Sequence, residues 1–575
     1  MENIRKTEKV ICMILEDINS DFSKELVKSV ANAISENKQI RLVVLPVKYD
    51  YGIEDNSLHK YREIYNNILR FSEICSIDGL IIHLGNVSER DKNSHGIVDE
   101  LLERLRDIPK VLVASDLKDA VTVNYNNENG IREAIEFIAN IEGLTKICML
   151  GGRDDNKDAR DRKEIFIKCL HDYRLEYSED QFENTDMSED SFAAAERLLD
   201  RNPNVQAIFC INDAVAKGLY TTLKARGKII GRDIMVFGFD NTRMSSDLDP
   251  PLSSVGADSS SLGGRALELL LSIINGDEAR SDTVPTRLYG RASMPYETYE
   301  YNPIELSKAE PAFIYKMFND CFYRYKLESI DRENVDLKRL FFEFMSKMLT
   351  ACKHSYMDVE TFGKLNMMID KFFEKGAMRY TDSTKLTTSI EKIQNIMNKN
   401  ARSLAATVFI NRLFARMKDR AIVNQSKELI SHERKTNRVR QQIKEFIVSG
   451  MDKTGCSMYR NFDKLGLDNA LLFIFEKPIV HDLGEETLLP KNILLKCMMH
   501  MGDLYLMPEE RQKFRVEDIF GCNKLTMKCN GFVSFPVICG RRLFGLLMCE
   551  LTDDICENGE FIAMELGRSL ALSEQ

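Results

Sequence analysis

Residues 205–241, VQAIFCINDAVAKGLYTTLKARGKIIGRDIMVFGFDN, decide the fold of this chain because they form one strand–helix–strand unit. Val205–Ile211 is an apolar run of strand length, and Asn212 and Asp213 follow it as a helix-capping pair. After the helix, Ile234–Phe239 is a second apolar run. Two parallel strands joined by a right-handed helical crossover end at the same edge of a sheet. The unit therefore predicts a parallel α/β sheet.

Polar side chains follow both strands of this unit. Asn212 and Asp213 come after the first strand, and Asp240 and Asn241 come after the second. Open α/β sheets bind ligands outside the carboxyl ends of their strands, so these residues are candidates for a ligand site. The alternative is that Asn212 or Asp213 only caps the helix and that Asp240 only forms a turn. Because two adjacent strand ends carry such pairs, we favour the ligand site.

The same stretch carries a resemblance to a known family. Ala207–Gly218 and Gly231–Asn241 resemble the receptor core shared by the lactose and purine repressors and the periplasmic sugar-binding proteins. Further motifs occur in the family's order within residues 9–295; they are 17–22, 78–82, 250–255, Gly263 and 284–286. The resemblance implies a periplasmic-binding-protein-like α/β fold, in which two doubly wound parallel sheets form two lobes. It also implies a small ligand in the cleft between the lobes.

The order of apolar and helical stretches agrees with two lobes. For the first lobe we expect strands at 10–15, 40–46, 79–84 and 110–113, and helices at 22–37, 61–75 and 98–106. Residues 121–125 lead away into the second lobe, for which we expect a strand at 146–150, helices at 128–141, 162–171 and 191–200, and the strand–helix–strand unit. After Pro250 and Pro251 we expect a return to the first lobe with a helix at 261–274 and a crossing back with a strand at 284–289.

Length and composition set limits on the class of protein. A chain of 575 residues is too long for one core, and 44% hydrophobic and 29% charged residues are typical of a globular protein. The net charge of −10 argues against a chain that binds nucleic acid electrostatically along its whole length. The first apolar run, Val10–Leu15, is too short for a signal peptide or a membrane span. No later run is long enough either, so we expect a cytoplasmic protein without a membrane partner.

Three regions follow from these patterns: a receptor at 1–300, a helical linker or coiled-coil-like segment at 301–450, and a small α+β domain at 451–575. Helical spacing continues through 310–448. Beyond it we expect a strand at 470–475, a β-hairpin of 532–538 and 543–551, and a helix at 560–572. This order, with Gly545 inside the second hairpin strand, resembles a GAF-type sensor or dimerisation domain.

Motifs for other chemistries are sparse. The fourteen cysteines include no CxxC, and Cys497 with His500 is a single pair that could contribute two zinc ligands, so we expect buried reduced thiols and no cofactor. The Gly151-Gly152 turn lacks the spacing of nucleotide-binding loops. Eight scattered histidines, with neither HExxH nor G-x-S-x-G, give no catalytic site. Asp17 and Asp240 could form the carboxylate pair of a glycosidase, but we expect a binding protein and no enzyme.

The resemblance assigns the ligand contacts residue by residue. A polyol needs planar bidentate donors and acceptors for vicinal hydroxyls and an apolar face for its ring. The family's pattern places the polar contacts on Asp17, Asn126, Arg162, Asn212 and Asp240. Since the chain has no tryptophan, ring contacts fall to Phe22, which we include in the site, or to Tyr125, Phe209 or Phe239. Ile165 replaces a family glycine, Asn126 replaces a frequent Asp and Ala257 a frequent polar residue, so we expect a sugar-like ligand other than the familiar sugars.

These observations predict a cytoplasmic small-molecule sensor of a transcriptional or signal-transduction regulator. Because eight or nine residues precede the first expected strand, we expect no helix-turn-helix headpiece there. We expect DNA contact only indirectly or through a partner. The basic patch at 434–444 is either a solvated helix face or a nucleic-acid contact.

Two alternatives remain: the sensory part of a signalling enzyme, such as a diguanylate cyclase whose catalytic domain is absent here, or a simple carbohydrate-binding protein. We also expect a homodimer held partly through residues 401–448. Apolar residues recur there at helical intervals; they are Leu404, Val408, Phe414, Met417, Ile430 and Ile443.

Overall fold

The structure is a computed structural model of the chain. It describes residues 9–16, 18–35, 39–48, 56–84, 101–115, 117, 120–154, 156–257, 259–294, 310–322, 325, 337–351, 358–381, 383–450, 457–482, 487–522 and 531–573. Among these residues, no helix combines the length and the apolarity needed to cross a membrane.

The first lobe is a parallel sheet between two layers of helices. Its strands lie side by side in the order β5 (Val121–Asn126), β4 (Lys110–Val113), β3 (Gly79–His83), β1 (Lys9–Glu16) and β2 (Ile40–Val47). Successive side chains of a strand point to opposite faces. Ile11 and Met13 accordingly join the core beside α1 (Asp21–Ile34) and α10 (Ser259–Ile274), while Cys12 joins the core beside α2 (Asn56–Tyr65) and α3 (Leu69–Ile74).

The second lobe repeats this construction with its own core. Parallel strands follow the order β7 (Phe182–Glu183), β6 (Ile147–Leu150), β8 (Ala207–Cys210), β9 (Met235–Phe239) and β10 (Ser253–Ala257). Four helices surround the sheet: α5 (Asn127–Glu136), α6 (Lys157–Asp172), α7 (Phe192–Arg201) and α8 (Asp213–Ala225). The predicted strand–helix–strand unit is β8, α8 and β9, and it lies in the middle of this lobe.

The two lobes are joined by crossing segments. β5 belongs to the first sheet and leads directly into α5 of the second lobe. After α9 (Arg243–Asp247) and β10, the chain returns to the first lobe as α10, which packs beside α1, as predicted. β11 (Asp282–Tyr289) then pairs with both β5 and β10, so it lies in both lobes. The fold of residues 9–294 is the predicted two-lobed one.

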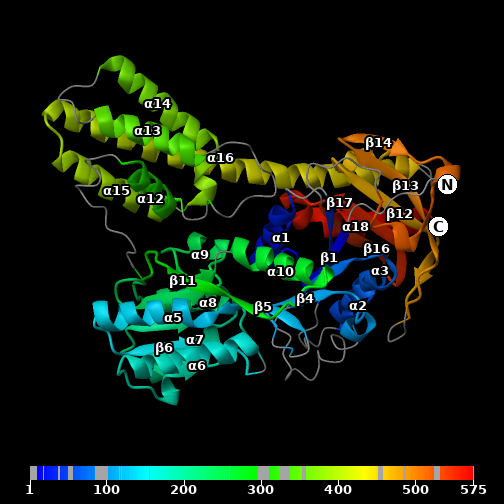
Figure 1. Cartoon of the computed structure of the whole chain (residues 1–575), viewed down its shortest axis with the longest axis horizontal. Helices are drawn as coiled ribbons and strands as arrows, with labels where there is room; N and C mark the ends of the chain where they lie inside the picture. Colours follow the sequence, from blue (N-terminus) through cyan, green and yellow to red (C-terminus); the bar gives the residue numbers. More distant parts are fainter. Residues whose placement is uncertain are drawn as a thin grey trace.

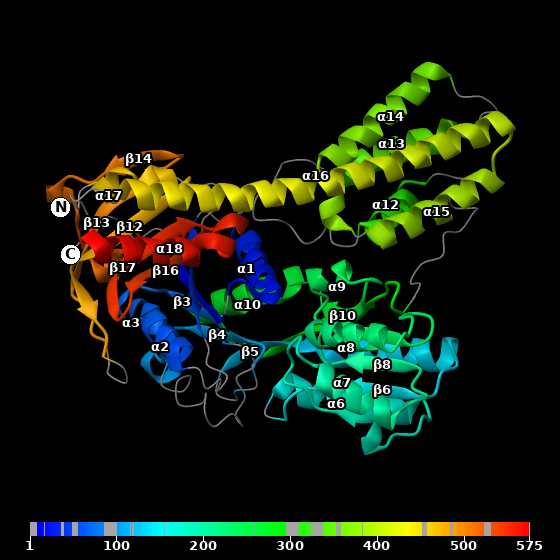
Figure 2. The same ribbon diagram turned by 180° about the vertical axis from the view of Figure 1, so that it is seen from behind.

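Helices follow at one end of the molecule. α12 (Pro311–Cys321), α13 (Leu337–Ala351), α14 (Val359–Glu374) and α15 (Ser383–Lys399) share a phenylalanine-rich core with the first turns of α16 (Leu404–Gly450). α16 has 47 residues, which corresponds to about 70 Å at 1.5 Å per residue. It leaves the bundle and ends against the C-terminal sheet (Figures 1 and 2).

The C-terminal region is an antiparallel sheet that continues the sheet of the first lobe. Its strands follow the order β16 (Gly531–Cys539), β17 (Arg542–Glu550), β12 (Ala470–Val480) and β13 (Asn492–His500). β14 (Asp503–Leu506) and β15 (Lys513–Arg515) both pair with β13. α18 (Asp553–Ser573) packs on this sheet, and β16 pairs in parallel with β2. Two hydrophobic cores therefore run from the first lobe into this region.

Some expected elements differ from the structure. The helix expected at 61–75 is interrupted at Asn66, whose side chain bonds the backbone N–H and carbonyl of Lys48 at 2.8 and 2.7 Å and so competes with helical geometry.

β7, β10 and the strands β13 to β15 were not expected. β10 contains the serines Ser253 and Ser254, whose hydroxyls form buried hydrogen bonds, so it lacks the hydrophobicity of a buried strand. The first residues of the helix expected at 98–106 lie outside the described residues.

Candidate functional site

Helix capping explains part of the polar edge at β8. The side chain of Asn212 accepts a hydrogen bond from the backbone N–H of Val215 at 2.9 Å and donates one to the carbonyl of Met187 at 3.0 Å. Asn126 caps α5 in the same way, through the N–H of Glu128 at 3.1 Å. Both predicted ligand residues therefore also have a structural role at a helix N-terminus.

Asp213 is buried beside the end of β9. Its carboxylate accepts hydrogen bonds from the N–H and the hydroxyl of Thr242 at 2.8 and 2.9 Å, and from the hydroxyl of Ser254 at 2.6 Å. Burial and the nearby carboxylate of Asp240 raise the pKa of Asp213 to about 7, against the opposing effect of these hydrogen bonds. Asp213 thus ties α8 to β10 and to the segment that follows β9, at the polar edge of this sheet.

Arg162 and Asp240 meet at this edge. Arg162 is only 3% exposed, and its Nη2 lies 3.4 Å from Oδ1 of Asp240. The guanidinium also donates to the carbonyl of Ile211 at 2.7 Å and lies 3.5 Å from the ring centroid of Phe239. Burial raises the pKa of Asp240, while Arg162 opposes this shift. Asp240 itself has a φ of 93°, a left-handed conformation that is costly for a side chain other than glycine.

Two further polar residues support Arg162. Asn127 accepts a hydrogen bond from Nε of Arg162 at 3.4 Å and donates one to Asp158 at 3.1 Å. The carboxylate of Asp158 also lies 3.8 Å from Nη2 of Arg162. Neither residue was expected from the sequence, although Asp158 stands four residues before Arg162 on a helix, a spacing that brings side chains together.

Aromatic rings connect the lobes at the same place. The ring of Phe22 on α1 lies 6.2 Å from that of Tyr125 on β5, and Tyr125 lies 6.4 Å from Phe239 on β9. His83 at the end of β3 lies 4.7 Å from Phe22, and burial lowers its pKa, which favours the neutral ring. Burial raises the pKa of Tyr125, and the carboxylate of Asp240 adds to this shift. The rings thus form a chain from the first lobe to the second.

The predicted site residues therefore fall into three groups. Arg162 and Asp240 are in contact, and Phe22 is linked to them through Tyr125 and Phe239. Asn126 and Asn212 follow β5 and β8, which belong to different sheets, and each caps a helix. Asp17 lies outside the described residues. His83 is not among the residues expected from the sequence, although its place at the end of the apolar run of β3 marks it as a strand-end residue.

Within the described part of the chain, three or more His, Cys, Asp or Glu side chains are nowhere grouped as a metal site. The described cysteines are free of disulfide bonds, and all but the half-buried Cys539 are buried.

Comparison with known proteins agrees with this architecture. Residues 141–294 match the family of the periplasmic binding protein-like domain. The HTH-type transcriptional repressor PurR of Vibrio atlanticus is 27% identical over 201 residues, which are 34% of this chain and 58% of that repressor. The probable HTH-type transcriptional repressor ExuR of Bacillus subtilis is 27% identical over 282 residues, which are 47% of this chain and 74% of that protein. These matches confirm the resemblance stated from the sequence, although the chain spans only about 58% of PurR.

Solved structures with similarity to the chain include two regulators. The complex of the transcriptional regulator CelR with cellobiose is 21% identical with a TM-score of 0.41 and covers 50% of this chain and 86% of its own. The lac repressor dimer bound to operator and the anti-inducer ONPF is 20% identical with a TM-score of 0.41 and covers 51% of this chain and 96% of its own.

Proposed function

We propose that this chain is the small-molecule sensor of a transcriptional or signalling regulator, and that it binds a sugar-like or polyol ligand between its two lobes. The observation that carries the proposal is the convergence of side chains from both lobes at the carboxyl ends of the strands. Phe22 comes from the first lobe, Tyr125 from a crossing strand, and the Arg162–Asp240 pair from the second lobe. The similarity to repressors supports ligand sensing as the role.

Each group has a chemical task in this proposal. Asp240 offers carboxylate oxygens to vicinal hydroxyls, while Asn126 and Asn212 offer both donors and acceptors. Arg162 donates hydrogen bonds to Ile211, Asn127 and Asp240. We propose that it orients the carboxylate of Asp240 and that its remaining N–H groups can donate to the ligand. Phe22 and Tyr125 are half-buried and supply the apolar face that a sugar ring needs. Asp17 is proposed as a further contact from the first lobe.

The remaining regions are proposed as transmission and output. The proposed regions are a receptor at 1–300, a helical segment at 301–450 and a GAF-like domain at 451–575. An antiparallel sheet with α18 packed on it supports the last assignment. The proposed output is a homodimer that reaches DNA only indirectly or through a partner.

A thermal-shift screen against sugars, nucleosides and polyols tests the proposal. A ligand at a hundred times its dissociation constant adds roughly 2.7 kcal/mol of stability, which raises the melting temperature by several degrees. Calorimetry with the hit should then show Asp240→Ala binding about ten- to a hundredfold more weakly, because a hydrogen bond to a charged group is lost. Asp277→Ala, an exposed carboxylate in the loop after α10, is the matched control and should bind like the parent. Equal binding by Asp240→Ala and the parent would reject the site.

A further inference from the structure

The turn that follows β9 carries Asp240 in an unusual backbone conformation. Asp240 and Asn241 have φ angles of 93° and 49°, so two consecutive residues with side chains lie in the left-handed region. Each residue of this kind costs free energy, and it persists only where its surroundings hold it. The carboxylate of Asp240 lies 3.4 Å from Nη2 of Arg162. Its position therefore depends on the contacts that hold this turn.

Strand β10 holds the main chain of the turn. The backbone N–H of Asp240 donates to the carbonyl of Val255 at 2.8 Å, and that of Asn241 donates to the hydroxyl of Ser254 at 3.0 Å. The turn also packs closely on this strand, because a Cβ at Gly256 would lie 2.6 Å from Cβ of Asn241. These contacts fix the backbone of the turn, whereas the side chain of Asn241 is held from another segment.

Arg291, just after β11, holds the side chain of Asn241. Arg291 is 6% exposed, and its Nη2 donates to Oδ1 of Asn241 at 2.6 Å. Its Nη1 donates to the carbonyl of Leu252 at 2.7 Å and to the hydroxyl of Ser245 at 3.2 Å. One planar guanidinium thus joins both ends of the segment between β9 and β10. A lysine keeps the charge but has a compact ammonium in place of the planar fork, so it cannot reproduce these three contacts.

The strand before Arg291 also reaches a second predicted site residue. β11 pairs with β5 of the first sheet, and the hydroxyl of Thr286 donates to the carbonyl of Asn126 at 2.6 Å. Arg291 follows Thr286 by five residues and contacts the turn of Asp240. One crossing segment therefore holds the end of β5 and the turn after β9.

We propose that Arg291 is a positioning residue of the ligand site: by holding the side chain of Asn241, it keeps Asp240 in the left-handed turn with its carboxylate against Arg162. Arg291 touches no ligand itself and acts through Asn241 and Asp240. Its importance for binding rests on the proposed function, in which Asp240 contacts the ligand. The position of Asp240 can be measured without a ligand, so this inference can fail while the proposed function stands.

A double-mutant cycle of Arg162→Ala and Asp240→Ala in the full chain reports whether Asp240 is held against Arg162. In the parent, the two changes should depart from additivity by at least about twofold in the unfolding equilibrium constant of the second lobe. Urea denaturation with hydrogen exchange in β8 and β9 measures this constant. In the Arg291→Lys background the coupling should vanish, because the fork that holds the turn is lost. Arg287→Lys, the same change at an exposed position of β11, is the matched control and should keep the coupling.

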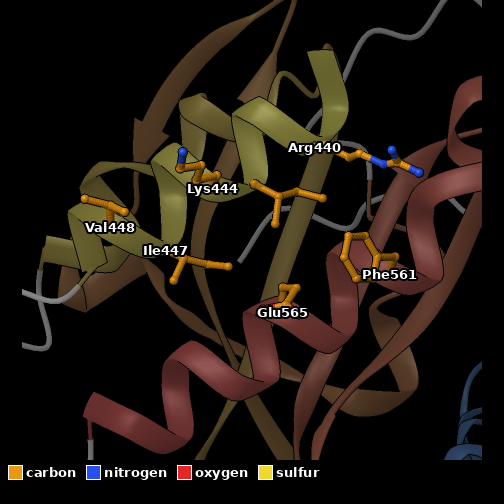
Figure 3. A pocket seen from close by; sticks show the side chains of 7 residues that line it. Arg440, Lys444, Ile447, Val448, Phe561 and Glu565 are labelled. Carbon is orange, nitrogen blue, oxygen red and sulfur yellow. The ribbon is translucent and has the colours of Figure 1, made fainter. Parts of the chain in front are cut away.

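Two further variants separate the loss of this contact from a general loss of stability. Asn241→Gly removes the acceptor of Arg291 but suits a φ of 49°, so it should abolish the coupling without backbone strain; it decides alone if Arg291→Lys does not fold. Ile447→Ala changes an apolar groove between α16 and α18 (Figure 3) and should destabilise the C-terminal region while the coupling stays intact.

Three outcomes overturn the role of Arg291. In the first, the parent shows no coupling, so that Asp240 is not held against Arg162. In the second, the coupling persists in folded Arg291→Lys or in Asn241→Gly. In the third, Ile447→Ala abolishes the coupling as well, which would make its loss a global effect.

Discussion

The two lobes have the same construction but different relations to the rest of the molecule. The first lobe shares both of its hydrophobic cores with the C-terminal region, and its edge strand β2 is paired with β16. The second lobe has a core built only from residues 125–294, and its edge strand β7 has two residues. A short edge strand is a common protection against unwanted pairing. The first lobe is therefore anchored to the C-terminal region, and we expect the second lobe to be the one that moves if the proposed ligand closes the two lobes.

The contacts of the first lobe reinforce this anchoring. Arg41 is buried and donates to the carbonyls of Phe520 and Cys522 at 3.4 and 2.8 Å. Tyr61 donates to Glu560 at 2.7 Å, and three ion pairs join lysines of the first lobe to acids of α18; they are Lys24–Glu557, Lys28–Asp553 and Lys48–Glu560.

The largest effect should follow from damage to the shared core. Phe532 on β16 is buried opposite Val43 of β2. Phe532→Ala should cost about 3–5 kcal/mol and should raise hydrogen exchange in β1 and β2 as well as in β16 and β17. Phe209→Ala is the matched change in the second lobe, where the ring is also fully buried, and should affect that lobe alone. If Phe532→Ala leaves β1 and β2 protected, the two regions do not unfold as one unit.

A smaller loss is expected from Arg162→Ala. The change leaves the carbonyl of Ile211 and the carboxylate of Asp240 without their donor, so we expect the second lobe to lose about 2–3 kcal/mol. Urea denaturation followed by hydrogen exchange would locate the loss. Protection of the first lobe should stay at the parent's level, and a loss that spreads to β16 would contradict the independence of the second lobe.

The second lobe should also respond to pH through Asp213. Its pKa is raised to about 7 in the folded protein, so between about pH 4 and 7 the folded lobe holds a proton that the unfolded chain releases. Stability contributed by this group is present at low pH and is lost as the pH rises, on the order of 1 kcal/mol per pH unit. Denaturation at pH 5 and 7 should show this loss for the parent and less of it for Asp213→Asn. An equal pH dependence in both proteins would assign it to other groups.

The smallest effect concerns the ion pairs between α1 and α18. Lys28 lies 2.8 Å from Asp553, and both side chains are partly exposed, so we expect the pair to contribute about 0.2–1 kcal/mol. A double-mutant cycle with Lys28→Ala and Asp553→Ala measures the coupling, and about 1 M salt should reduce it. A coupling well above this range would mean that surface charges, rather than the shared core, hold the two regions together.

Much of the fold could be predicted because it depends on local patterns. The strand expected at 110–113 coincides with β4, and the return of the chain to the first lobe through 261–274 is seen as α10. Asn66 breaks the helix expected at 61–75 through a contact with Lys48, which no local pattern reveals. The pairing of β2 with β16 joins residues almost 500 positions apart, and neither strand carries a signal that names its partner.

The candidate site shows the same limit. Asn212 and Asp240 could be chosen because strand ends of parallel sheets gather at one edge. Arg162 came from the family resemblance, and the structure brings it to Asp240 across 78 positions. Asn127 and His83 were missed because their contacts with Arg162 and Phe22 join separate elements. Periodicity describes one element at a time, whereas a site is made where several elements meet.

The parallel pairing of β2 with β16 has a consequence for biosynthesis. Leu42 faces Gly531, and a ribosome that adds roughly 5–20 residues per second needs about 25–100 s to synthesise the chain between them. During that time β16 is not yet synthesised, so the edge of β2 and the first-lobe residues of both shared cores lack their partners on the nascent chain. An unpaired strand edge of this kind can pair with strands of other chains. We expect ribosome-bound chains that stop near residue 500 to recruit chaperones through the first lobe and to release them once β16 and β17 have emerged. Crosslinking of arrested chains of increasing length would reveal that release, and chaperone contact that ends before residue 531 would show that the first lobe closes its edge without help.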